Sequence, residues 1–208
     1  IGISMEPTFV ALGRNHVAVG GNNRAWFYEA SEESKEVNQR EYIGSIQEIH
    51  LNATVAAVLS RGCVNVHMID GSVAGADDVK MFPERDDSRN ATCAALTDDF
   101  LVFGTGSGGI HYVHLEDWHG VNEYRHETGI RRLHVNATAT RVVFVDDGQK
   151  AFVYNPTNDE SIEISQFPGG PTTVLWDNKD WGVFVAAEAS EVRTYVYAPT
   201  TMHGPKVT

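Results

Sequence analysis

The residues 104–109, GTGSGG, resemble a phosphate-binding loop. Such a loop needs a helix directly after its glycines, because the helix N-terminus holds the phosphate. Here the chain continues as IHYVHL, residues 110–115, which has the composition of a strand. Since glycine tolerates positive φ, we interpret the stretch as the turn of a β-hairpin over residues 100–115. A bound nucleotide is not expected.

Nine histidines raise the question of a metal site. His111 and His114 are three residues apart on a predicted strand, so their side chains point to opposite faces. His50 and His67 belong to different strands and have no cysteine or carboxylate at ligand spacing. We therefore expect no metal and no other cofactor.

Three pairs of neighbouring aspartates resemble the carboxylates of propeller glycosidases: Asp86-Asp87, Asp98-Asp99 and Asp146-Asp147. Glycoside hydrolysis needs two carboxyl groups facing each other across a pocket at a fixed separation. The second and third pairs instead fall in tight turns beside apolar strands, where aspartate is favoured and solvated. The interpretation is that the protein is not an enzyme.

The hairpin recurs along the chain. Copies are recognisable at residues 15–28, 52–69, 140–156 and 181–197. Taking Val17, Ala56, Leu101, Val142 and Val183 as equivalent, subtraction of positions gives spacings of 39, 45, 41 and 41 residues. These spacings fit the roughly 40–45 residues of a four-stranded propeller blade. We predict an all-β, WD40-like β-propeller in which residues 1–208 form a single domain.

About five blades are visible, and propeller rings close with about four to eight. We expect this chain to be part of a larger, seven-bladed ring. In the first repeat, strands a, b and c are predicted at 8–13, 16–21 and 24–30, an acidic loop at 31–40, and the outer strand d at 41–46. Residues 71–90 form the longest predicted loop.

The blades are predicted to be degenerate. They lack the Gly-His and Trp-Asp pairs of regular WD40 repeats, so we expect no buried Asp–His–Ser/Thr hydrogen-bond set. Stability should then come from apolar b strands such as residues 142–145, which are apolar at every position and must be covered on both faces.

Three Asn-Ala-Thr sequons, at Asn52, Asn90 and Asn136, suggest a rival class, a secreted and glycosylated propeller. Asn52 and Asn136, however, occupy the same a-to-b turn two repeats apart, where asparagine is favoured as a turn residue. Cys63 and Cys93 lie in different repeats and are interpreted as buried, reduced thiols of a cytosolic protein.

The charge of the chain excludes several partners. Lys and Arg number 16 against 28 for Asp and Glu, which gives a formal net charge of −12. Such a surface repels nucleic acid and anionic lipid. The sequence contains no run of about 18 apolar residues, so no direct membrane insertion is expected.

Six blocks of the sequence carry a resemblance to a known family. They are GGNNRAWFY (20–28), ALTDDFLVFGT (95–105), LEDWHGVNEYRH (115–126), VYNPTND (153–159), VLWDNKDWGVFVA (174–186) and TMHGPKV (201–207). In order and rough spacing these blocks resemble the second propeller of the WD-repeat protein nineteen family, the one-hundred-and-forty-four-kilodalton subunits of intraflagellar transport complex A.

The resemblance implies a non-catalytic scaffold that supports retrograde ciliary transport and the ciliary entry of membrane cargo. It implies a place on the cytoplasmic side of the cilium or flagellum and at the basal body. The implied partners are the other complex A subunits, with membrane-cargo adaptors reached indirectly. Two alternatives stay open, a different coat or tethering propeller and a secreted propeller that binds or cleaves glycans.

Asp117 and Trp118 are the candidate partner-contact residues. They lie in Glu116-Asp117-Trp118, where a predicted c strand ends, so the indole is expected to be partly exposed. Tryptophan is enriched among the residues that dominate interface energies. The alternative is that Trp118 packs beneath its own loop as a structural anchor.

Overall fold

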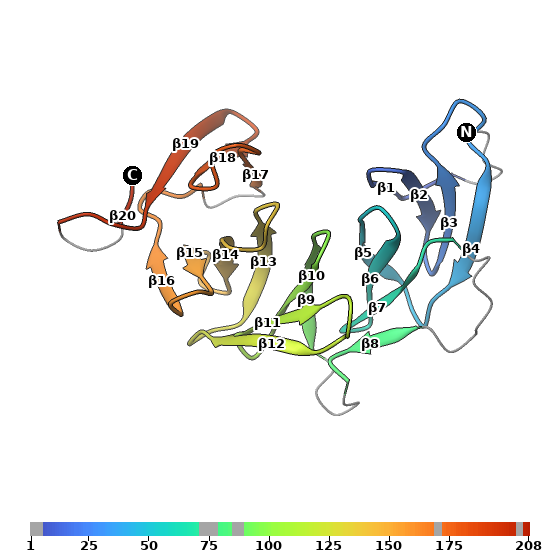
Figure 1. Ribbon diagram of the computed structural model, residues 1–208, viewed down its shortest axis with the longest axis horizontal. Coiled ribbons are helices and arrows are strands. Elements are labelled where there is room, and N and C mark those ends of the chain that lie inside the picture. The colour runs from blue at the N-terminus through green and yellow to red at the C-terminus, as the bar shows by residue number, and fades with distance from the viewer. Residues whose placement is uncertain (1–5, 71–78, 85–89, 169–171, 203–205) are drawn as a thin grey trace. The chain divides into compact units, whose positions relative to one another are not determined.

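The computed structural model describes residues 6–70, 79–84, 90–168, 172–202 and 206–208. Within these ranges it contains five four-stranded sheets, whose strands are labelled in Figure 1. The predicted all-β class and five-fold repeat are therefore confirmed. By internal contacts the chain divides into two compact units, residues 1–96 and 97–208.

The first unit contains two complete sheets and one further strand. Its first sheet has the order β1-β2-β3-β4, with β1 Phe9–Leu12, β2 His16–Gly21, β3 Arg24–Glu29 and β4 Glu36–Glu41. Its second sheet has the order β5-β6-β7-β8, with β5 Ile46–Leu51, β6 Val55–Ser60, β7 Cys63–Met68 and β8 Lys80–Phe82. The further strand is β9 Ala91–Leu96.

The second unit holds the remaining strands. The third sheet has the order β12-β11-β10-β9, with β10 Phe100–Thr105, β11 Gly109–His114 and β12 Gly120–Arg125. The fourth sheet comprises β13 Ile130–Val135, β14 Val142–Asp146, β15 Ala151–Asn155 and β16 Glu160–Glu163. The fifth comprises β17 Thr173–Trp176, β18 Val183–Glu188, β19 Glu191–Ala198 and β20 Lys206–Val207.

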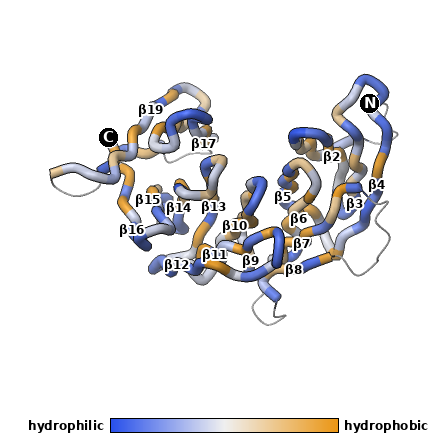
Figure 2. The backbone as a smooth tube through the Cα atoms, in the orientation of Figure 1, coloured by the Kyte–Doolittle hydropathy of each residue, from blue (hydrophilic) through white to orange (hydrophobic). Residues whose placement is uncertain are grey.

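The second strand of a sheet is the most buried. Every residue of β6 and β14 is buried, and in β10 only Phe100 is partly exposed. An apolar strand of this kind needs cover on both faces, as the sequence predicted. Figure 2 shows the difference in composition, with hydrophobic colour along β6 and β14 and hydrophilic colour along much of the outer strand β12.

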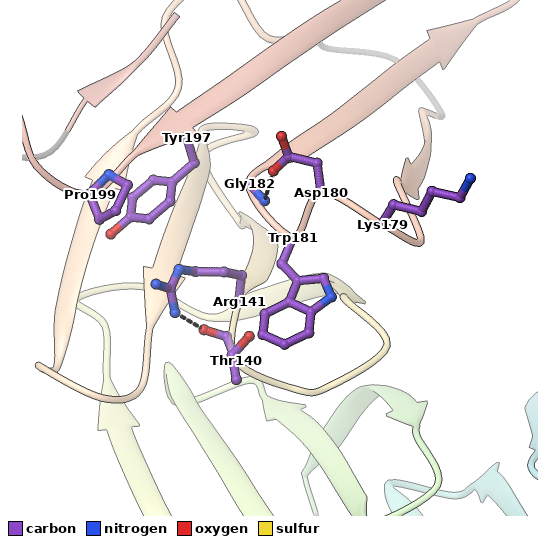
Figure 3. Close-up of a pocket in the computed structure, with 8 residues that line it drawn as sticks. All are labelled: Thr140, Arg141, Lys179, Asp180, Trp181, Gly182, Tyr197 and Pro199. Carbon is purple, nitrogen blue, oxygen red and sulfur yellow. Dashed lines mark hydrogen bonds between the residues drawn. The ribbon is translucent and has the colours of Figure 1, made fainter.

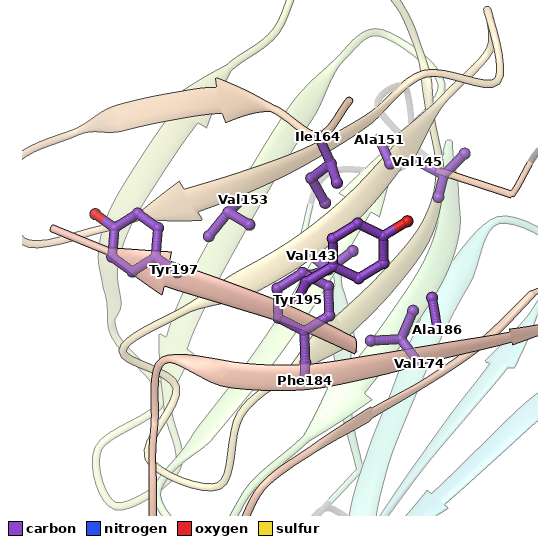
Figure 4. Close-up of a cluster of buried hydrophobic side chains, with 10 residues drawn as sticks. All are labelled: Val143, Val145, Ala151, Val153, Ile164, Val174, Phe184, Ala186, Tyr195 and Tyr197. Atoms are coloured by element: carbon purple, nitrogen blue, oxygen red, sulfur yellow. The ribbon is translucent and has the colours of Figure 1, made fainter. Parts of the chain in front are cut away.

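A core cluster of the second unit lies between the fourth and fifth sheets. Phe184 and Tyr195 stack with ring centroids 5.2 Å apart, and they pack with valines of β14 and β15 (Figure 4). The complete set of buried members is Val143, Val145, Ala151, Val153, Ile164, Val174, Phe184, Ala186, Tyr195 and Tyr197. In the first unit Phe27 and Ile69 belong to the corresponding cluster, which again draws on neighbouring sheets.

The predicted position of the outer strand in the first repeat was wrong. Residues 31–40 were expected to form an acidic loop and residues 41–46 the d strand, but β4 is Glu36–Glu41. An outermost strand has a hydrogen-bonded neighbour on one side and exposes part of its surface, so the polar sequence EVNQRE suits it. Most of the predicted loop 71–90, with Asp86 and Asp87, lies outside the described residues.

A hydrogen-bonded Asp–His–Thr set around the buried Asp146 is present, although none was expected. Asp146, at the end of β14, accepts hydrogen bonds from His126 Nε2 at 3.3 Å and Thr128 Oγ1 at 3.1 Å. Its second oxygen accepts the Lys150 backbone N–H at 2.8 Å. The prediction failed because it looked for a Gly-His pair, whereas Arg125 precedes His126 here.

These hydrogen bonds outweigh the effect of burial on Asp146. Burial raises the pKa of a carboxyl group, yet the bonds from Lys150, His126 and Thr128 hold the pKa of Asp146 below its ordinary value. Asp146 is therefore a satisfied, ionised group inside the fold. Its neighbour Asp147 is exposed and forms an ion pair with Arg131 at 2.9 Å.

The core assignment predicts unequal effects for one substitution at two leucines. Leu101→Ala, at a site with no exposed surface, should lower the free energy of unfolding by about 2–5 kcal/mol. Leu175→Ala is the matched control, because Leu175 is 63% exposed and should cost less than about 1 kcal/mol. Urea denaturation measures both, and equal losses would contradict the strand assignment.

The neighbouring aspartates provide a second comparison. Asp146→Asn weakens three charge-assisted hydrogen bonds in a buried site and should cost about 1.5–3 kcal/mol. Asp147→Asn breaks one exposed ion pair and should cost less than about 1 kcal/mol. If thermal melts show the two variants to be equally stable, the buried set has no stabilising role.

Candidate interaction surface

The glycine-rich stretch is a hairpin turn, as predicted. Phe100 lies opposite His114 and Gly104 opposite Ile110 in the β10–β11 register. Thr105 Oγ1 accepts the Gly109 N–H at 2.8 Å, and Gly108 has φ of +91°. A side chain at Gly108 would place its Cβ 2.4 Å from the His126 carbonyl oxygen. The glycine is thus needed for the close approach of two loops.

Two of the three sequon asparagines serve as turn residues. Asn52 is 8% exposed, and its Oδ1 accepts the Val55 N–H at 2.7 Å. Asn136 has no exposed surface, and its Oδ1 accepts the Arg141 N–H at 3.1 Å. The predicted turn role is confirmed at both positions. Asn90, the third, is exposed.

The described histidines do not form a metal site. Within the described ranges, no group of three or more His, Cys, Asp or Glu side chains is placed to hold a metal ion. His111 stacks on Phe103 with ring centroids 4.8 Å apart, and burial lowers its pKa. Cys63 and Cys93 are both buried, and neither forms a disulfide.

His67 belongs to a buried polar contact in the first unit. It lies on β7 and is 1% exposed. Its Nε2 is 2.7 Å from the Tyr42 hydroxyl, and its Nδ1 is 2.8 Å from the Met68 carbonyl oxygen. Burial lowers the pKa of His67 to about 4, assisted by the positive charge of Arg40. The ring is neutral at physiological pH.

Asn38 and Asn122 make the same contact in the two units. Asn38, on β4, donates its Nδ2–H to the carbonyl of Ile69, just after β7, at 3.1 Å. Asn122, on β12, donates to the carbonyl of Pro156, just after β15, at 3.2 Å. In each case the outer strand of one sheet is bonded to the end of the third strand of the next sheet.

His67 predicts how stability depends on pH. An unfolded histidine titrates near pH 6.5, so between about pH 6.5 and 4 the unfolded chain binds the proton and the folded chain does not. Stability should therefore fall by about 3 kcal/mol as the pH falls through this window, and His67 adds no further loss below it.

The variant His67→Gln isolates this effect, because it keeps a polar side chain but does not titrate. The free energy of unfolding of parent and variant should be measured by urea denaturation from pH 7.5 to 4. The free energy of unfolding of the variant should fall less over this pH range, because the contribution of His67 is absent. Parallel curves for the two proteins would show that His67 is not responsible.

Asp117 and Trp118 lie in the turn between β11 and β12. The Trp118 N–H donates to the His114 carbonyl at 2.9 Å, and the His119 N–H donates to Asp117 Oδ1 at 3.2 Å. Asp117 Oδ1 is also 3.1 Å from His114 Nδ1. The hydrogen bond from His119, together with the adjacent histidines, lowers the pKa of this exposed carboxyl. Asp117 thus holds the turn in shape.

Trp118 has an unusual backbone conformation. Its φ is +61°, in the left-handed region that favours glycine and is uncommon for a bulky residue. The side chain is half-buried. Strain of this kind, of order 1 kcal/mol or more, persists where the surrounding structure fixes it and is concentrated at functional sites. The indole is retained here at the expense of local backbone strain.

A groove of about 580 Å³ lies on the second unit, lined by residues of the fourth and fifth sheets (Figure 3). Arg141 precedes β14, Trp181 precedes β18, and Tyr197 lies near the end of β19. The Arg141 guanidinium carbon is 5.0 Å from the centre of the Tyr197 ring, a cation–π geometry. The lining residues are Thr140, Arg141, Lys179, Asp180, Trp181, Gly182, Tyr197 and Pro199.

Comparison with known proteins decides the family. The sequence pattern described as the WDR19 second beta-propeller matches residues 1–208. The chain belongs to this family. It is 42% identical over 213 residues to the mouse WD repeat-containing protein 19 and 40% identical to the human protein. The Caenorhabditis elegans protein dyf-2 is 29% identical over 208 residues, covering 88% of this chain.

The mouse and human comparisons include 100% of this WDR19-family chain, and the chain spans 16% of the length of each relative. Solved structures agree on the WD40-like propeller fold. Kluyveromyces lactis Hsv2 matches with a TM-score of 0.74 over all of this chain and 74% of its own, at 9% identity. The WD40 domain of Toxoplasma gondii coronin matches with a TM-score of 0.67 over 90% of this chain and 54% of its own, at 9% identity.

Sequence reasoning missed the groove of this WDR19-family chain. Arg141, Trp181 and Tyr197 come from three loops or strand ends, and no local pattern joins them. One usable signal was the tryptophan directly after the polar run of residues 177–180, because a large apolar residue at a loop end is a candidate for exposure.

The described part of the chain contains no helix that is long and apolar enough to span a membrane.

Proposed function

We propose that residues 1–208 act as one non-catalytic propeller domain that binds other protein subunits of intraflagellar transport complex A. The observation that carries this proposal is the family match over every residue of the chain, together with 42% and 40% identity to mouse and human WDR19. The resemblance in sequence blocks supports the same assignment. A propeller offers several loop surfaces on a rigid frame, which suits a scaffold.

The proposed setting follows from the family. The domain would support retrograde ciliary transport and the ciliary entry of membrane cargo, at the basal body and on the cytoplasmic side of the cilium or flagellum. Its partners would be the other complex A subunits, with membrane-cargo adaptors contacted indirectly. A net charge of −12 gives no electrostatic attraction to nucleic acid.

The state of the acidic residues supports a non-catalytic role. Asp146 is saturated by hydrogen bonds inside the fold, and Asp147 is paired with Arg131. Asp98 and Asp99 are exposed in the turn before β10, where the Asp99 carbonyl accepts the Leu115 N–H at 2.9 Å. These turn and core roles differ from those of a glycosidase, whose two carboxyl groups face each other across a pocket.

The turn that holds Asp117 and Trp118 is the proposed contact with a partner subunit. Trp118 is half-buried, so part of the indole is accessible, and its strained φ sets the direction in which the indole points. Asp117 fixes the turn through His114 and His119. A rigidly presented aromatic side chain loses little entropy on binding and can dominate an interface.

The variant Trp118→Gly tests this contact. Glycine suits φ of +61°, so relief of strain should offset the lost packing, and the free energy of unfolding should change by less than about 1 kcal/mol. Recovery of the other complex A subunits with the tagged full-length protein should fall several-fold. Quantitative mass spectrometry of purifications from ciliated cells measures that recovery.

Gln149→Gly is the matched control, because Gln149 has the same φ of 61° and is exposed in the β14–β15 turn. It should leave both stability and subunit recovery unchanged. A stability loss of about 3–5 kcal/mol in Trp118→Gly would instead mean that the indole is a structural anchor. Unchanged recovery would remove Trp118 from the interface.

A further inference from the structure

The groove beside Arg141 contains an arginine that has no carboxylate partner among the described residues. Arg131, Lys150 and Arg193 each form an ion pair with a carboxylate, at 2.9, 3.3 and 2.7 Å. For Arg141 the described residues provide no carboxylate within ion-pair distance. The acidic chain therefore keeps an arginine without a carboxylate partner in a concave site.

Protein contacts hold the Arg141 side chain in place. One guanidinium nitrogen, Nη1, donates to the Thr140 carbonyl and, at 2.9 Å, to Asn155 Oδ1. The guanidinium also lies over the Tyr197 ring. These contacts use a single one of its nitrogens, and the remaining N–H donors have no hydrogen-bond acceptor among the described residues. A positioned guanidinium of this kind is suited to a carboxylate.

The apolar part of the groove lies next to this cation. Trp181 is 54% exposed, and Pro199 and the Tyr197 ring also line the groove. Lys179 adds a second positive charge. Among the described lining residues, Asp180 is the one carboxylate; its Oδ1 accepts the Gly182 N–H at 3.0 Å, and its side chain points away from Arg141 (Figure 3).

We propose that this groove binds an acidic, extended segment of a partner protein, with a glutamate or aspartate carboxylate on Arg141 and an adjacent apolar side chain against Trp181. Charge complementarity selects this occupant, because the lining has two cations and one carboxylate that is already hydrogen-bonded. Trp, Tyr and Arg, which line the groove together, are the residue types that dominate interface energies. The inference rests on the proposed scaffold function and names a second contact for it.

Direct binding tests the proposal with the full-length protein. The probe is a short fluorescein-labelled peptide of alternating glutamate and leucine, and its neutral twin has glutamine in place of each glutamate. Fluorescence anisotropy should show binding of the acidic peptide at least about tenfold tighter than binding of the twin. Absence of binding, or equal affinities, would overturn the proposal.

Three variants assign the binding to the groove. Arg141→Gln and Trp181→Ser should each weaken binding of the acidic peptide by about tenfold. Arg131→Gln is the matched control, an exposed arginine outside the groove, and should change affinity less than about twofold. Trp181→Ser keeps the test valid if Arg141→Gln fails to fold, because the Trp181 side chain is largely exposed.

The other possible outcomes also test the proposal. If Arg141→Gln and Trp181→Ser fold and bind like the parent, the acidic peptide binds elsewhere and the proposal is wrong. Displacement of the peptide by inorganic phosphate at matched ionic strength would identify a small-anion site instead. The two proposals can fail separately. Peptide binding tests this inference, whereas recovery of the complex A subunits tests the proposed function, so loss of one with the other intact shows which proposal is wrong.

Discussion

The second strand of each sheet imposes the main constraint on this structure, because it has to be covered on both faces. β6 and β14 are buried at every residue. A sheet containing such a strand cannot exist alone and is stable when another sheet packs against it. The repeat of about 40 residues reflects that requirement, because neighbouring sheets such as the fourth and fifth cover each other.

Close packing of this kind determines the state of the polar groups that it traps. His67 is neutral because its site is buried, while Asp146 is ionised because three donors converge on it. Asn52 and Asn136 are buried and bonded to the backbone of their own turns. The buried polar groups thus fix the ends of strands, where apolar side chains have no directional bonds to offer.

The sequence allowed prediction of those features that depend on local pattern. The hairpin at residues 100–115 follows from alternating apolar strands and glycines, and the turn role of Asn52 follows from its place in the repeat. The outer strand β4 was misplaced because a polar edge strand has the composition of a loop. The Asp146 set and the Arg141 groove were missed because their members become neighbours only when separate segments pack together, a relation that one sequence does not contain.

The paired asparagine contacts of Asn38 and Asn122 bear on how such a chain can be divided. Each makes the outermost strand of one sheet depend on a carbonyl that comes more than 30 residues later in the sequence. A boundary drawn between two sheets would remove the acceptor and leave the asparagine facing water. During synthesis on the ribosome, likewise, β4 and β12 gain this tether only after the third strand of the following sheet has emerged, so the first and third sheets are completed after most of the next sheet has been made.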